Sequence, residues 1–150
     1  GNSIHGRAGF RETGGSPLPG RPSVIHSVNE NLSGVDGVQI QDLDSFNRYS
    51  RAGSVVVVRP RMDDRTRETC LEKAAGILSR ELPFDNEYRL DTPESLYCTE
   101  LLHRVFADSL WPGADAFTET RGILSFDGFL DSRYFDVIIS HNRAIPARSL

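Results

Sequence analysis

The stretch that decides the fold is Glu94–Phe106, ESLYCTELLHRVF, where an extended segment turns into an amphipathic helix. From Cys98 onward, apolar residues recur at helical spacing and form one face: Leu101, Leu102, Val105, Phe106 and Leu110. Cys98 therefore falls in the first turn of this helix. Unpaired N–H groups and the helix dipole stabilise a thiolate at that position. The pattern leaves two interpretations open, a cysteine buried in the core and a nucleophile.

The rest of the chain predicts an α+β fold with a mainly antiparallel sheet, in one domain spanning residues 1–150. A helix is expected over Asp63–Leu82, with Asp63 or Asp64 as N-cap. The helix that begins near Cys98 is expected to end at WPG, residues 111–113. Apolar and β-branched runs predict strands. The expected strands are Ser3–Phe10, Ser23–Val28, 34–43, Gly53–Pro60 and Tyr134–Ser140.

Composition excludes several classes of protein. The chain has 150 residues, 38% hydrophobic and 25% charged, with a formal net charge of −4. This balance is typical of a soluble globular domain and offers no basic face for nucleic acid. The longest aliphatic run, Val55–Val58, is far shorter than a membrane span. Since the sequence opens on GNSIHGRAGF without Met or a signal peptide, we expect a processed chain or a fragment, truncated at its N-terminus.

The two cysteines have different surroundings. Cys70 lies mid-helix, four residues before Ala74, which is typical of packing. Cys98 is followed by Thr99 and Glu100 at a helix start. Neither context resembles a disulfide scaffold, so both are expected to be free thiols.

A nucleophilic cysteine needs a histidine from elsewhere in the fold, oriented by a third polar group. His103 lies five positions beyond Cys98, roughly 140° round the same helix, and therefore points away. His5 and His26 each interrupt an apolar, strand-like segment. A histidine satisfied within the core is the simpler explanation for either one. The cysteines and histidines show no metal-ligand spacing, so no metal or cofactor is expected.

The order of these motifs resembles a known family. SIHGRAGF carries His5, SVIHSV carries His26, and VVVVRPR at 55–61 follows. PFD at 83–85 and LYCTEL at 96–101 then open the cysteine helix. Together they resemble the circularly permuted papain-like hydrolases of the NlpC type, in the YiiX-like branch related to lecithin–retinol acyltransferases. In that family the histidine precedes the cysteine in the chain.

The resemblance implies a role for each matching residue. Cys98 would be the nucleophile, His5 the acid and base, and His26 the residue that fixes the His5 tautomer. The N–H of Cys98 and the Tyr97 hydroxyl would hold the oxyanion. Glu100 would be structural, bonding backbone near the site.

The family also bounds the function. It implies a cysteine hydrolase of amide or peptide bonds, with a peptide or bacterial cell-wall fragment as substrate. Action on lipid acyl esters or thioesters, by hydrolysis or acyl transfer, is a second possibility. A papain-like binding module without turnover is a third. The compartment would be the cell envelope or the exterior if the substrate is peptidoglycan; the oligomeric state stays open.

Overall fold

The computed structural model describes residues 20–48, 54–110, 119–120 and 123–142. The expected strand Ser3–Phe10, with His5, lies outside these residues. The strands are β1 (Ser23–Val28), β2 (Gly37–Asp42), β3 (Ser54–Pro60), β4 (Glu119–Thr120), β5 (Ile123–Leu124) and β6 (Phe135–Asn142). The helices are α1 (Glu30–Ser33), α2 (Leu43–Asn47), α3 (Asp64–Leu78), α4 (Cys98–Leu110) and the 3-10 helix η1 (Asp127–Leu130). The α+β class is therefore confirmed.

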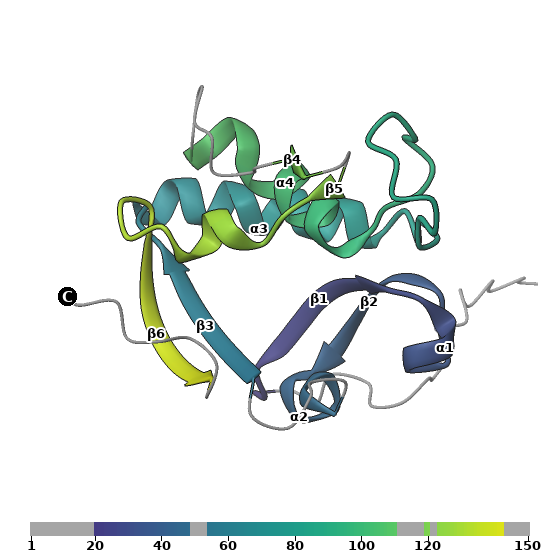
Figure 1. Ribbon diagram of the computed structural model, residues 1–150, viewed down its shortest axis with the longest axis horizontal. Helices are drawn as coiled ribbons and strands as arrows, with labels where there is room; N and C mark the ends of the chain where they lie inside the picture. The colour runs from purple at the N-terminus through teal and green to yellow at the C-terminus, as the bar shows by residue number, and fades with distance from the viewer. Residues whose placement is uncertain (1–19, 49–53, 111–118, 121–122, 143–150) are drawn as a thin grey trace, which may run out of the picture.

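The described strands form three antiparallel pairs, β1–β2, β3–β6 and β4–β5. We expected one mainly antiparallel sheet, and the described part of the chain has three small two-stranded sheets instead. In Figure 1 the β1–β2 and β3–β6 ribbons diverge from each other, while α3 and α4 lie across one side of both. A bulge between Val57 and Val58 shifts the register of β3 against β6. Such a bulge increases the local twist and bends a ribbon.

Helix α3 begins where the sequence predicts. The Asp63 side chain accepts a hydrogen bond of 2.7 Å from the Thr66 N–H, as an N-cap does. The helix ends at Leu78, four residues before the expected end. Glu81 has a φ of 49°, outside the helical region, and Pro83 follows. Residues 79–97 therefore run irregularly to the start of α4.

The main core lies between α3, α4 and the β1–β2 ribbon. Cys70 is only 3% exposed, which confirms its predicted packing role. It belongs to a cluster of buried residues from β2, α3, the connecting residues 79–97 and α4: Val38, Cys70, Leu82, Leu96, Leu101 and Val105. Burying such side chains is the dominant favourable term in folding.

Gly37 allows β2 to approach the chain that leaves α3. Its φ is 88°, and a Cβ built there would lie 2.1 Å from the carbonyl oxygen of Leu82. The next residue, Val38, donates its N–H to that same oxygen at 2.9 Å. The contact therefore requires a residue without a side chain.

We predict that Gly37→Ala destabilises the protein more than Gly34→Ala does. Gly34 also has a positive φ, 77°, but a Cβ there would meet nothing within 4 Å. Gly34→Ala should cost about 1 kcal/mol for the left-handed backbone. Gly37→Ala should cost a further ~1–3 kcal/mol, because the added carbon overpacks the Leu82 contact. Denaturant unfolding measures both; equal losses would contradict the close approach.

Candidate functional site

Cys98 is the first residue of α4, as predicted, and its side chain is half-buried. Backbone hydrogen bonds hold the residues before it in place. Leu96 donates its N–H to Pro83 at 3.0 Å and accepts from Asp85 N–H at 3.3 Å. Leu96 and Tyr97 are both fully buried. The thiol thus lies at a helix start, directly after a buried and hydrogen-bonded segment.

Electrostatics at this thiol favour the neutral form. Burial raises the pKa of Cys98, and the N–H groups of Thr99 and Cys98 act in the opposite direction without overcoming it. The start of α4 alone therefore does not produce a thiolate near neutral pH. A nucleophilic role for Cys98 requires a cation beside the sulfur.

Strand β1 contacts the segment before Cys98 through Ser27. The buried Ser27 hydroxyl donates to the Leu96 carbonyl oxygen at 2.6 Å. Ser27 pairs with Val38, which belongs to the core cluster. Because strand residues alternate between faces, His26 lies on the opposite face from Ser27. His5, the third member of the predicted triad, lies outside the described residues.

His26 has its own partners on that face. Its Nε2 lies 3.0 Å from Oε1 of Gln41, and the Phe46 ring meets the imidazole edge-on at a centroid distance of 5.1 Å. Burial lowers the pKa of His26, and the bond to Gln41 opposes that shift. The imidazole is consequently neutral at pH 7.

Gln41 is a candidate functional residue that the sequence did not single out. It is only 1% exposed. In the run VQIQD the glutamines alternate with apolar residues, which predicts a solvent-facing side of the strand. The signal that could have identified Gln41 is its position relative to His26 on the paired strand. Gln41 lies diagonally across the ribbon from His26, whose direct partner is Gln39.

Tyr97, the predicted oxyanion donor, points into the core. Its hydroxyl oxygen accepts the N–H of Leu124 at 3.2 Å, and its ring lies 5.4 Å from that of Tyr88. Burial raises the pKa of this phenol, so it stays protonated. Tyr97 therefore ties β5 to the start of α4.

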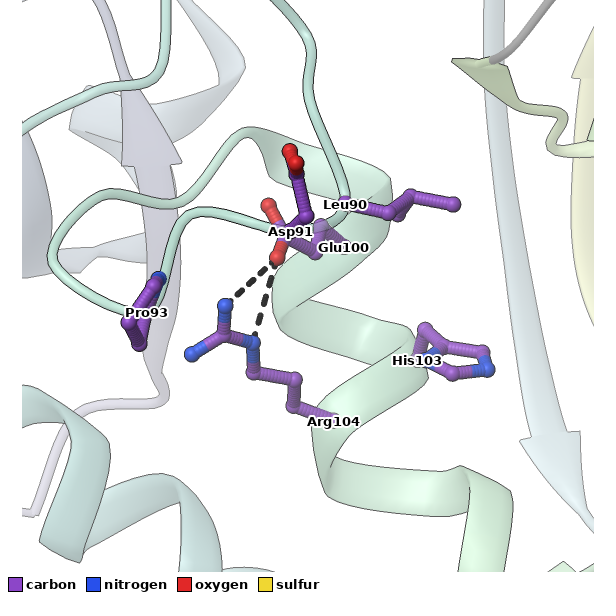
Figure 2. Close-up of a pocket in the computed structure, with 6 residues that line it drawn as sticks. All are labelled: Leu90, Asp91, Pro93, Glu100, His103 and Arg104. Atoms are coloured by element: carbon purple, nitrogen blue, oxygen red, sulfur yellow. Dashed lines mark hydrogen bonds and ion pairs between the residues drawn. The ribbon is translucent and has the colours of Figure 1, made fainter.

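Glu100 is buried and forms an ion pair with Arg104. Its side chain is 2% exposed, and one oxygen accepts from Nε and Nη2 of Arg104 at 3.2 and 2.7 Å. Figure 2 shows the second oxygen turned away from the guanidinium. Arg104 also donates to the Thr92 carbonyl oxygen at 3.0 Å. Glu100 thus forms an ion pair with the side chain of Arg104, and Arg104 in turn holds the 85–93 loop to α4.

A hollow of about 370 Å³ lies beside this ion pair (Figure 2). Its lining residues come from α4 and the 85–93 loop: Leu90, Asp91, Pro93, Glu100, His103 and Arg104. The α4 members lie two, five and six positions beyond Cys98, roughly 140–240° round the helix. The hollow therefore lies on the side of α4 away from Cys98, and His103 is one of the residues that line it.

In the described part of the chain, no group of three or more His, Cys, Asp or Glu side chains could hold a metal ion. None of the helices described is both long and apolar enough to span a bilayer. Comparison of the chain with protein-family models, curated proteins and solved structures finds no match in any of the three.

We predict that Arg104→Met destabilises the protein by about 3 kcal/mol at pH 7, because Glu100 would be left as a buried, unpaired charge. Burial already raises the pKa of Glu100, with Arg104 opposing. In the variant, the folded-state pKa rises further above the unfolded value. The loss should therefore be largest above the new pKa and shrink as pH falls below the raised pKa of Glu100 in the unaltered protein, where Glu100 is protonated in the folded state of both proteins.

The matched control is Lys73→Met. Lys73 pairs with the exposed Asp108 at 3.3 Å, and such pairs contribute about 0–1 kcal/mol. Urea unfolding at several pH values measures both variants. A loss for Arg104→Met that does not change with pH would contradict the buried-charge explanation.

Proposed function

We propose that this protein is a cysteine hydrolase of amide bonds in a peptide or cell-wall fragment, with Cys98 as nucleophile. The observation that carries the proposal is the position of Cys98. It is the half-buried first residue of a thirteen-residue helix and follows a hydrogen-bonded, buried segment. The motifs on either side resemble the permuted papain-like hydrolases.

In the proposed mechanism His5 takes the thiol proton, and the sulfur of Cys98 attacks the substrate carbonyl carbon. The N–H of Cys98 holds the oxyanion. The His5 imidazolium then protonates the leaving amine as the C–N bond breaks, which leaves a thioester. Water, losing a proton to His5, cleaves the thioester, and the proton returns to the sulfur.

Because the pKa of Cys98 is raised, the proposed mechanism requires a charged partner beside the sulfur. Burial alone keeps this thiol protonated, so catalysis needs an imidazolium beside it. The strand expected to carry His5 precedes β1 in sequence, and β1 contacts the approach to Cys98 through Ser27. We propose that His5 supplies the charge and that His26 orients it.

Two observations favour a second candidate, a papain-like binding module without turnover. Burial raises the pKa of Cys98, and His26 lies on the face of β1 opposite Ser27. In such a module the thiol would titrate above ~8.5, whatever residue stands at position 5.

We predict that Cys98 in the unaltered chain reacts with iodoacetamide with an apparent pKa well below ~8.5, through the ion pair with His5. In His5→Ala the apparent pKa should rise above that value, because only burial then acts. Mass spectrometry of each cysteine-containing peptide across pH measures both. Cys70, buried in the core, is the internal control; a high pKa for Cys98 in both proteins would favour the binding module.

We predict hydrolysis of muropeptides, and little cleavage of short acyl esters, by the unaltered chain. Cys98→Ala should abolish turnover, and His5→Ala should lower it by about 10²–10⁴-fold. Cys70→Ala, which keeps the nucleophile, should retain the activity. Product analysis by mass spectrometry reads out both substrate sets. Cleavage of esters alone would replace the proposed substrate with a lipid acyl group.

A further inference from the structure

Tyr88, in the 85–93 loop, has a backbone conformation that is unfavourable for a bulky residue. Its φ is 56°, in the left-handed region that glycine and asparagine adopt most easily. Strain of this kind persists only where the surroundings enforce it, and it is frequent at sites that hold a ligand. The backbone alone favours glycine here, so the benefit of this residue lies in its ring.

A buried carboxylate holds the backbone on both sides of Tyr88. The Asp85 side chain accepts the N–H groups of Glu87 and Arg89 at 2.9 and 2.6 Å. Asp85 is buried, so water competes little for these bonds. The left-handed conformation of Tyr88 is therefore imposed by the loop.

The ring of Tyr88 lies against the segment that leads into Cys98. It meets the Tyr97 ring at a centroid distance of 5.4 Å and the Phe84 ring edge-on at 5.9 Å. Tyr97 directly precedes Cys98 and is fully buried, whereas Tyr88 is 40% exposed. Packing thus uses only part of the Tyr88 ring, and the remainder is open to solvent close to the proposed nucleophile.

The charged residues beside Tyr88 disfavour an anionic ligand group. Two nitrogens of Arg89 donate to the Asp91 carboxylate at 2.9 and 2.8 Å, and a third lies 3.8 Å from the Glu87 carboxylate. With two carboxylates to one guanidinium, the surroundings of the ring are acidic. The exposed part of the ring is itself apolar surface, to which an uncharged group with an apolar face is complementary.

We propose that Tyr88 is a substrate-binding residue, whose half-exposed ring packs against an uncharged, apolar face of the substrate near the amide bond that Cys98 attacks. The inference rests on the proposed function and specifies one part of its substrate. An extended peptide spans about 3.3–3.6 Å per residue, so a group a few residues from the scissile bond reaches the ring. The sugar ring of a muropeptide and an apolar peptide side chain both present such a face.

The test separates substrate binding from a purely structural role. In Tyr88→Ala the KM for muropeptide hydrolysis should rise about tenfold with kcat unchanged, because a contact made equally in the ground and transition states is lost. Iodoacetamide labelling of Cys98 should keep its rate, since this small reagent does not need the ring. Slower labelling, or a fall in kcat alone, would mean that Tyr88 only supports Tyr97 and would overturn the proposal.

Conservative variants and a matched control keep the test decisive. Tyr88→Phe retains the ring, so its KM should stay within about twofold of that of the unaltered chain. Leu71→Ala removes another exposed apolar side chain, on α3, and should leave KM unchanged. Equal rises in KM for Tyr88→Phe and Tyr88→Ala would overturn the role of the ring. If thermal unfolding shows that Tyr88→Ala does not fold, Tyr88→Leu replaces it with the same expected rise in KM and the same contrary outcome.

Binding without turnover distinguishes the two sources of the apolar face. Cys98→Ala, with and without Tyr88→Ala, is titrated calorimetrically with a muropeptide, its sugar part and its stem peptide. Affinity that depends on Tyr88 for the sugar part assigns the ring to the sugar, and the same dependence for the stem peptide assigns it to a side chain. No dependence for any of the three ligands would overturn the proposal.

These measurements also separate the role of Tyr88 from the proposed function. If affinity depends on Tyr88 but the unaltered chain hydrolyses nothing, the binding role stands and the proposed function fails. If the chain hydrolyses muropeptides with a KM that Tyr88→Ala leaves unchanged, the proposed function stands and the role of Tyr88 is overturned.

Discussion

The hydrogen bond from Ser27 to the Leu96 carbonyl oxygen is the constraint on which the site depends. It joins residues 69 positions apart, at 2.6 Å, in the core. Leu96 is in turn bonded to Pro83 and Asp85, so the approach to Cys98 is held from two directions. A buried hydroxyl of this kind is costly to leave without its partner. The place of the thiol relative to β1 therefore depends in part on a polar contact at the edge of an apolar cluster.

Burial shifts the pKa values of Cys98 and His26, the two described members of the proposed triad, in opposite directions. It raises the pKa of Cys98 and lowers that of His26, because each charged form loses hydration. Both groups are consequently neutral at rest. If the protein is an enzyme, the charge that activates the sulfur has to come from a further residue. Whether Cys98 can act as a nucleophile therefore depends on whether His5 supplies this charge.

The sequence predicts features that depend on local chemistry. The start of α4 at Cys98, the Asp63 cap and the packing of Cys70 follow from helical periodicity and capping alone. Asp42 caps α2 in the same way as Asp63 caps α3, by accepting the Ser45 N–H at 2.9 Å. Contacts between distant segments were not predictable. Alternation shows that Gln41 shares a face with His26, but it does not show that this face is buried. Nor does any local pattern pair Ser27 with Leu96 or divide the strands into three small sheets.

The 85–93 loop has a consequence for whatever enters the hollow behind α4. The Asp85 carboxylate accepts the N–H groups of Glu87 and Arg89 at 2.9 and 2.6 Å and the Thr92 hydroxyl at 3.3 Å. The loop is thus ordered from within, and its entropy is lost when the chain folds. A visiting molecule would meet a wall that is already formed and would keep more of its interaction energy as affinity. A preformed wall of this kind favours a ligand that already fits its shape over one that would require the loop to rearrange.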